Sequence, residues 1–138
     1  MRLRPVAAAD LEIIRQLRNA NRESFLYDSE VSVEQHAAWF RAIADKPINF
    51  YVIEEDGLVV GTISTTRSNE GIEIGNLTLD RAARGKGLMR QAVGELTARP
   101  GHYFAEVKSG NAPSLAVFDA TGFKIVSGGQ VLRLSKDV

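Results

Sequence analysis

Two segments in the N-terminal third repeat apolar residues at helical spacing. They cover residues 11–20 and 33–45, and each predicts an amphipathic helix. Asp10 precedes the first segment and is expected to cap that helix. Ser32 and Gln35 form the S-x-x-Q pattern of a capping box, which fixes the start of the second helix. We therefore expect two helices near the N-terminus, after a short strand over residues 2–6.

The middle of the chain has the pattern of an antiparallel meander. Three β-prone segments cover residues 49–55, 58–66 and 72–80. Asp56-Gly57 separates the first two segments, and this dipeptide tolerates the positive φ angles of a tight hairpin turn. The sequence S-N-E-G separates the second segment from the third. Three consecutive strands joined by short turns follow from this pattern.

The C-terminal part alternates helices and strands again. We expect a helix over 86–98, a strand over 102–107, a helix from Asn111 to a stop at Gly122, and strands over 123–127 and 130–135. The complete order is β-α-α-β-β-β-α-β-α-β-β. This order predicts one α+β domain over residues 1–138 with a mainly antiparallel sheet.

Composition narrows the function classes. Seventeen basic residues balance seventeen acidic ones, so net charge does not favour nucleic acid or a membrane surface as a partner. The chain has no cysteine and only two histidines, which excludes disulfides and thiolate chemistry and makes a metal site unexpected. No apolar segment has the length of a signal peptide core or a membrane span. We therefore expect a cytoplasmic protein.

The strongest chemical signal is the sequence Arg84-Gly85-Lys86-Gly87, where a strand passes into a helix. The first N–H groups of a helix lack partners inside the helix and point outward at the positive end of its dipole. Glycines allow a large anion to approach this backbone, and basic side chains add charge. The segment therefore predicts a diphosphate cradle. Its spacing fits neither a P-loop nor the G-x-G-x-x-G dinucleotide motif, since position 90 is Arg90.

Two motifs carry a family resemblance. R-G-K-G-L-M resembles the R/Q-x-x-G-x-G/A signature of the GNAT superfamily of acetyl-CoA-dependent N-acetyltransferases, with Arg84 and Gly87 in register and Met89 where Gly or Ala is usual. N-A-P-S-L-A-V-F-D-A-T-G-F, residues 111–123, resembles the second GNAT segment, and one helix and one strand separate the two motifs, as in the family. The positions of this second segment in register are Asn111, Ser114, Val117, Phe118, Gly122 and Phe123.

The resemblance implies the GNAT fold, with acetyl-CoA as cosubstrate in a cleft between two splayed strands. The pantetheine arm would pair with strand backbone like an added strand. The diphosphate would lie on the glycine loop, and the acetyl group would pass directly to a primary amine. The cofactor-binding residues that it implies are Leu77, Thr78, Leu79, Arg84, Gly85, Lys86, Gly87, Leu88, Met89, Asn111, Ser114 and Phe118.

Glu73 is the candidate general base, because a glutamate at this strand position serves as base in some members of the family. Strict alternation would place Glu73, Gly75, Leu77 and Leu79 on one face of the strand. The alternative is an ordinary solvent-facing glutamate. Phe118 stands where the family often has a tyrosine that protonates the leaving thiolate. Another group or water would then supply that proton, or the thiolate would leave unassisted.

The first two helices and the loop between them would bind the acceptor. The pattern L-R-N followed by S-x-E-x-H-x-x-W-F looks like GNAT members that acetylate amino groups on nucleotide-linked sugars. Aromatic rings stack on sugars or bases, and Arg or Asn binds phosphate or hydroxyl groups. Core packing of Trp39 and a polar-face position of His36 are the alternatives. The candidate acceptor residues are Arg18, Asn19, Phe25, His36 and Trp39.

The leading hypothesis is therefore an N-acetyltransferase that acts on a small amine, such as an amino sugar or a nucleotide-linked amino sugar. A second hypothesis has a protein N-terminus or lysine as acceptor. A third is an acyl-CoA-binding module without catalysis, which Met89 and Phe118 favour. GNAT relatives are often homodimers, and the segment 130–138 is a candidate for pairing with a partner strand.

Overall fold

The computed structural model describes all 138 residues as a single seven-stranded sheet with four α-helices. The strand order is β1-β2-β3-β4-β5-β7-β6, and only the β4–β5 pair is parallel. The strands are β1 (Arg2–Pro5), β2 (Ile48–Glu55), β3 (Leu58–Ser68), β4 (Gly71–Leu79), β5 (His102–Lys108), β6 (Lys124–Ser127) and β7 (Val131–Asp137). The helices are α1 (Leu11–Ala20), α2 (Val33–Ile43), α3 (Leu88–Leu96) and α4 (Ala112–Ala120).

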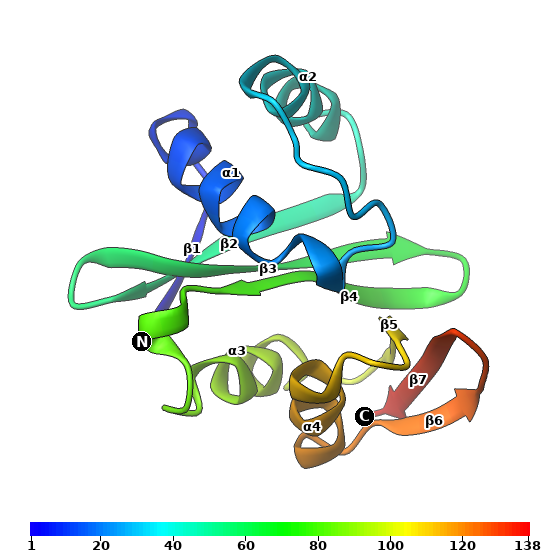
Figure 1. The fold of residues 1–138 in the computed structure, drawn as a ribbon. Helices are drawn as coiled ribbons and strands as arrows, with labels where there is room; N and C mark the ends of the chain where they lie inside the picture. Colours follow the sequence, from blue (N-terminus) through cyan, green and yellow to red (C-terminus); the bar gives the residue numbers. More distant parts are fainter.

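The helices cover both faces of the sheet. Helices α1 and α2 lie on one face, and α3 and α4 lie on the other (Figure 1). A small core of Ile14, Phe50 and Val52 joins α1 to the first strands, while a cluster of twelve buried residues fills the space beneath α3 and α4. Two layers of helices thus hold the sheet, and none of these helices is long and apolar enough to cross a membrane.

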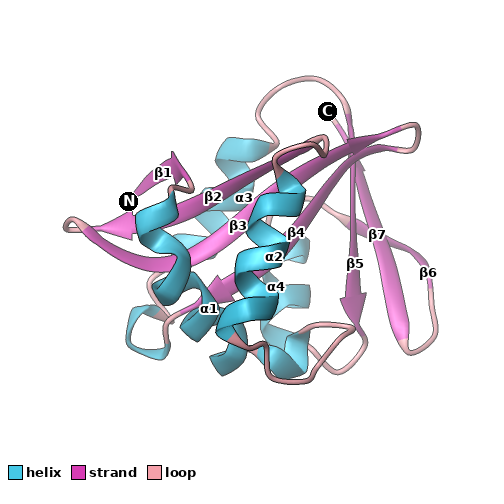
Figure 2. Ribbon diagram, turned by 90° about the horizontal axis from the view of Figure 1, so that it is seen from above, coloured by secondary structure: helices cyan, strands magenta, loops and turns pink.

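Strand β4 separates from β5 part of the way along its length. The parallel pairing covers only Ile72 with Tyr103 and Glu73 with Phe104. Beyond this point a bulge places residues 76 and 77 of β4 opposite the single residue Ile63 of β3. Figure 2 shows the two strands together at one end and apart at the other. The open end of this split faces the beginnings of α3 and α4.

The bulge overturns the expected alternation along β4. Asn76 adopts a left-handed conformation with φ 54°, so one extra residue enters the strand. Glu73 faces the α1–α2 side, whereas Leu77 and Leu79 pack with the core beneath α3. The prediction that Glu73, Leu77 and Leu79 share one face was therefore wrong, because strict alternation requires an unbroken register.

Most predicted elements are confirmed, in the predicted order and close to the predicted bounds. Asp56 and Gly57 have φ angles of 53° and 79°, as the predicted hairpin turn requires. The capping box is present, with Gln35 N–H donating to Ser32 Oγ at 3.1 Å and Ser32 N–H donating to Gln35 Oε1 at 2.9 Å. Helix α3 starts two residues later than predicted, because Gly87 is left-handed with φ 77° and still belongs to the loop.

Two details of the prediction were wrong. Asp10 does not cap α1, because its carboxylate accepts hydrogen bonds from the Arg4 guanidinium at 2.8 and 2.9 Å and from Ala7 N–H at 2.7 Å. The segment 130–138 is not an edge strand open to a partner, because β7 lies between β5 and β6 and pairs with β6 over residues 133–135. The outer strand at this end of the sheet is β6.

Candidate active site

A cavity of about 1120 Å³ occupies the split between β4 and β5. One wall comes from Leu77, Thr78 and Leu79 at the end of β4, and the floor comes from the glycine loop and the start of α3. The opposite wall is the end of β5 and one side of α4. The cavity therefore lies where the family resemblance expects the cofactor.

The glycine loop presents free backbone donors to this cavity. Gly85 and Gly87 have φ angles of 82° and 77°, a conformation that side chains with a Cβ rarely adopt. The first hydrogen bond of helix α3 runs from Gln91 N–H to the Gly87 carbonyl at 3.0 Å, and no internal partner is present for the N–H groups of residues 85–90. These groups and the helix dipole form the kind of site that binds phosphate groups.

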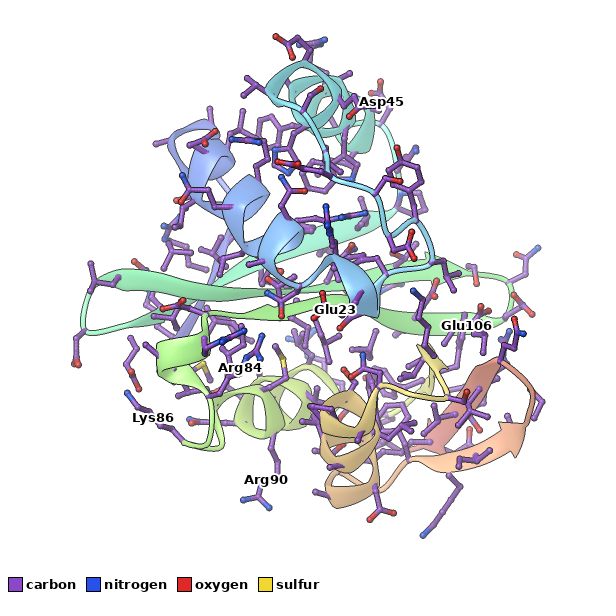
Figure 3. All side chains as sticks on the ribbon, in the orientation of Figure 1. Glu23, Asp45, Arg84, Lys86, Arg90 and Glu106 are labelled. Atoms are coloured by element: carbon purple, nitrogen blue, oxygen red, sulfur yellow. The ribbon has the colours of Figure 1, made fainter.

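The basic side chains around the loop have unequal roles. Arg84 lines the cavity, where its guanidinium donates to Asn21 Oδ1 at 3.0 Å and weakly to the Leu79 carbonyl at 3.4 Å. Lys86 pairs with Glu55 at 3.2 Å and lies outside the cavity lining. Figure 3 shows Arg84 beside β4 and Arg90 pointing away from the sheet. Arg84 therefore fastens the loop to the end of α1, and Lys86 is held outside the cavity by its ion pair.

Met89 does not obstruct the loop. It lies at the second position of α3, and its side chain is only 8% exposed within the main core cluster. Its position in the first turn of α3 brings it to the cavity edge together with Leu88. A larger residue than the usual Gly or Ala is thus accommodated by packing beneath the loop.

Helix α4 forms the far wall. Asn111 caps it by accepting a hydrogen bond from Ser114 N–H at 3.2 Å, and both residues line the cavity. The prediction missed the rest of this wall, although Pro113, Val117 and Ala120 recur at the helical spacing of a single face. It also missed lining residues that come from other segments: Asn21, Glu23, Ser24, Leu26, Arg90, Lys108, Ser109, Gly110, Gln130 and Val131.

A second cavity of about 340 Å³ adjoins the first on the α1–α2 side of the sheet. The two cavities share lining residues, among them Leu77 from the bulge, Lys108 from β5 and Asn111 from α4. Glu73 and Glu106 lie in the smaller cavity, one on each of the splayed strands. A group at the inner end of the large cavity therefore lies next to two carboxylates.

Glu73 has the electrostatics of a proton acceptor. Burial raises its pKa from the ordinary value, the charges of Glu106 and Glu70 raise it further, and Arg133 partly opposes them. Arg133 is itself engaged, since it lies 3.5 Å from Glu106 and 3.4 Å from Glu70. Glu73 is half-buried and is not a solvent-facing residue. A carboxylate with a raised pKa in a cavity is a common feature of general bases.

Phe118 belongs to the wall of the smaller cavity, not the larger one. Its side chain is 1% exposed and packs edge to face against Phe123, with ring centroids 4.9 Å apart. The ring therefore closes the inner end of the site with apolar surface. No proton donor stands at this position.

Only part of the predicted acceptor set lines the smaller cavity. Arg18 and Phe25 belong to its wall. Asn19 instead bonds the backbone of Val31, with its side-chain amide donating at 3.0 Å and accepting at 2.8 Å. Burial lowers the pKa of the Arg18 guanidinium from its ordinary value. The segment after α1 therefore contributes to the cavity through fewer residues than its sequence pattern predicted.

His36 and Trp39 line neither of the two cavities described above. Their rings stack with centroids 4.8 Å apart, and Trp39 also packs edge to face on Phe50 at 5.0 Å. His36 is 7% exposed, and burial together with the nearby charge of Arg15 lowers its pKa. Trp39 therefore follows the core-packing alternative, because helical periodicity turns this face of α2 towards the small core. The polar-face alternative for His36 was wrong, because its ring is buried against Trp39.

Comparison with protein families gives one match. The model described as "Acetyltransferase (GNAT) domain" matches residues 1–124. No curated protein sequence gave a significant match.

Solved structures show the same fold at low identity. A ribosomal-protein-alanine N-acetyltransferase from Brucella melitensis is 22% identical with a TM-score of 0.82, and the alignment covers 100% of both chains. A phosphinothricin acetyltransferase from Sinorhizobium meliloti, in complex with acetyl-CoA, is 21% identical with a TM-score of 0.81 over 99% of this chain and 88% of that one.

A third neighbour is a spermidine N-acetyltransferase from Vibrio cholerae in complex with CoA and spermine. It is 16% identical with a TM-score of 0.82, over 99% of this chain and 94% of that one.

The family match covers most of the chain, and the split sheet with its glycine loop agrees with it. The chain is a member of the GNAT acetyltransferase family.

Proposed function

We propose that the chain transfers an acetyl group from acetyl-CoA to the primary amine of a small molecule. The observation that carries this proposal is the junction of the two cavities at the split of β4 and β5. The larger cavity ends in free backbone donors, and the smaller one holds a carboxylate with a raised pKa. An acyl donor in one and an amine in the other would meet between them.

The chemistry of the groups that line the larger cavity suits acetyl-CoA. The diphosphate would accept hydrogen bonds from the N–H groups of residues 85–90, which have no partner within the chain. The pantetheine arm would extend along Leu77, Thr78 and Leu79, where β4 has no neighbour on its β5 side. Asn111 and Ser114 would border the arm from α4. Two of the solved neighbours described above contain this cosubstrate or CoA.

The proposed reaction is a direct attack. The acceptor nitrogen forms a bond to the carbonyl carbon of the thioester, the carbon–sulfur bond breaks, and the electron pair leaves on sulfur. The ammonium proton that must be lost passes to the Glu73 carboxylate, whose raised pKa suits it to accept that proton. A thiolate is a fairly good leaving group, because an ordinary thiol has a pKa of about 8.5. Its departure therefore proceeds without help from the apolar Phe118.

Charge and size favour a small cationic acceptor. Lys108 donates to the Glu23 carbonyl at 2.9 Å, and Arg18 donates to backbone carbonyls, so both cations of the cavity are engaged. Of the two carboxylates that line the cavity, Glu106 is paired with Arg133, whereas Glu73 has no ion-pair partner. A volume of about 340 Å³ lies at the lower end of the range for small-molecule sites. An ammonium group would be attracted to this cavity before it loses its proton.

An amino sugar fits these properties, and we keep it as the finer hypothesis. A nucleotide-linked amino sugar would place its nucleotide outside the smaller cavity. The sequence pattern that suggested nucleotide binding depends on Asn19, His36 and Trp39, whose positions give it no support. A protein N-terminus remains the alternative acceptor, and one solved neighbour is named for that activity. Cytoplasmic location and a single domain over residues 1–138 stay predictions from the sequence.

Calorimetry with acetyl-CoA, followed by an acceptor screen read by release of free CoA, tests the proposal. We expect binding of acetyl-CoA and turnover with small amines, with diamines and amino sugars ahead of N-acetylated controls and short peptides. No binding of acetyl-CoA would overturn the proposal. Tight binding without turnover of any amine would instead favour the acyl-CoA-binding module.

A further inference from the structure

The segment between α1 and α2 closes one side of the smaller cavity. Residues 25–31 contain no helix or strand, yet Phe25, Leu26 and Tyr27 all line this cavity. Leu26 also lines the larger cavity, although 67% of its side chain is exposed. Side chains from other elements must therefore hold the segment in place, because its own backbone has no sheet or helix to stabilise it. We call residues 25–31 the acceptor strap.

Arg18 is the centre of these contacts. Its guanidinium donates to the backbone carbonyls of Tyr27 and Ser29, the latter at 3.1 Å. It also lies over the ring of Phe25, 4.5 Å from the centroid, and 5.8 Å from that of Tyr27. One planar cation thus fixes two carbonyls and two aromatic rings of the acceptor strap.

A second contact lies one residue further along α1. Asn19 pairs with both backbone groups of Val31, accepting from its N–H at 2.8 Å and donating to its carbonyl at 3.0 Å. Arg15 donates to the same carbonyl at 3.2 Å. Residues three and four apart lie on the same face of a helix, so Arg15, Arg18 and Asn19 form a row of donors along α1.

These contacts leave little of Arg18 and Asn19 for a ligand. The Asn19 amide spends one donor and one acceptor site on Val31, and the Arg18 guanidinium covers one face of the Phe25 ring that could otherwise stack on a sugar. The carboxylates of the cavity, Glu73 and the Arg133-paired Glu106, belong to β4 and β5 on the opposite wall. The acceptor thus meets the strap's apolar side chains on one side and carboxylates on the other.

We infer that Arg18 and Asn19 are positioning residues that set the affinity for the acceptor by holding the acceptor strap against α1. The inference rests on the proposed function, since the acceptor is taken to occupy the smaller cavity. It assigns both residues an effect through Phe25, Leu26 and Tyr27, not through contact with the acceptor. Specificity would then lie in the side chains of the strap.

The test compares Arg18→Ala, Asn19→Ala and the double variant with Arg22→Ala, which removes an exposed arginine next to the strap that makes no side-chain hydrogen bond. Each single variant should raise the acceptor KM about tenfold or more, because a displaced wall misplaces the substrate. The kcat should fall much less, and the Kd for acetyl-CoA should stay unchanged. The rise in KM of the double variant should be smaller than the product of the two single rises, since both residues hold the same segment. Arg22→Ala should resemble the unaltered protein.

Hydrogen exchange supplies a readout that needs no acceptor. Val31 N–H should exchange faster in Arg18→Ala as well as in Asn19→Ala, although Arg18 makes no bond to this group. Arg18→Lys should give an intermediate KM, because an ammonium can serve a carbonyl but cannot cover the Phe25 ring as a planar group. The inference is overturned if Arg18→Ala raises KM while Asn19→Ala and the exchange of residues 25–31 do not change. Absence of acetyl-CoA binding by the unaltered protein would instead contradict the proposed function, and the exchange result would still report on the strap.

Discussion

The two cavities of the site are built in different ways. The larger cavity uses backbone N–H groups, two left-handed glycines and the free edge of β4, so most of its binding groups come from consecutive residues. The smaller cavity collects side chains from α1, the acceptor strap, β3, β4, β5 and α4. A backbone cradle suits one unchanging cosubstrate, whereas a cavity of side chains can change its ligand by single substitutions. The comparison predicts that substitutions in the two cavities affect different constants.

Glu73→Gln should show the largest difference between an effect on kcat and an effect on acetyl-CoA binding. Removal of a general base lowers kcat by about 10²- to 10⁴-fold, while the Kd for acetyl-CoA should not change. The acid limb of the pH–rate profile should disappear with it. Steady-state kinetics and calorimetry measure these quantities. A near-unchanged rate and pH profile would remove Glu73 from the mechanism.

The same substitution should stabilise the fold at neutral pH. Because the folded-state pKa of Glu73 is raised, its contribution to stability is present at low pH and is lost as the pH rises through the folded pKa. Gln carries no charge and avoids that loss, so its thermal midpoint should be higher above this window. Glu106→Gln is the matched control for the kinetics. It keeps Glu73 but removes a neighbouring negative charge that raises the pKa of Glu73, so the acid limb of the pH–rate profile should shift to lower pH.

Trp39 lies outside both cavities, so Trp39→Ala should change the stability of the fold without changing acceptor binding. Loss of a large aromatic side chain that packs on His36 and Phe50 should lower the free energy of unfolding by about 2 to 4 kcal/mol. The acceptor KM should stay the same at a temperature where the variant is folded. Denaturant unfolding and kinetics under matched conditions measure both. An acceptor KM that rises tenfold or more, with stability unchanged, would restore Trp39 to the acceptor site.

Gly87→Val should weaken the binding of acetyl-CoA to the larger cavity and leave the smaller cavity unchanged. A β-branched residue at φ 77° costs about 1 to 3 kcal/mol, or moves the N–H groups out of line, so the Kd for acetyl-CoA should rise roughly 10- to 100-fold. Gly94→Ala in the same helix is the control, because a Cβ there meets nothing within 4 Å. It should stabilise the helix by up to about 1 kcal/mol without changing the Kd. Equal effects of both variants would mean that the loop does not hold the diphosphate.

Features that depend on neighbouring residues could be predicted from the sequence, whereas features fixed by distant contacts could not. The capping box, the hairpin at Asp56-Gly57 and the glycine loop were predictable because each depends on neighbouring residues. The bulge at Asn76 was not, because its conformation is fixed by hydrogen bonds from distant parts of the chain. Thr62 donates to the Asn76 carbonyl at 2.7 Å, and the Asn76 amide donates to Ser64 at 2.8 Å. Alternation alone gives no sign of such a break.

The acceptor residues show the same limit. The L-R-N pattern was recognised, but whether Arg18 and Asn19 face a ligand or a loop depends on where residues 27–31 return to α1. Lys108 was missed because it lines the smaller cavity only through the separation of β5 from β4 beyond their short parallel pairing. His36 and Trp39 show a further ambiguity of the sequence, since an amphipathic face gives the same periodicity for a core as for a binding surface.

Phe118→Tyr should have the smallest effect. This position is buried between the smaller cavity and Phe123, so a hydroxyl added there could approach the sulfur of the bound thioester only from the inner end of the site. Since a thiolate leaves readily near neutral pH, the gain in kcat should be less than about tenfold. Single-turnover kinetics across the pH range measures it, with Phe123→Tyr as a control in the same buried pair. A gain of about a hundredfold, confined to Phe118→Tyr, would show that proton donation to sulfur limits the reaction and that the apolar end of the smaller cavity slows it.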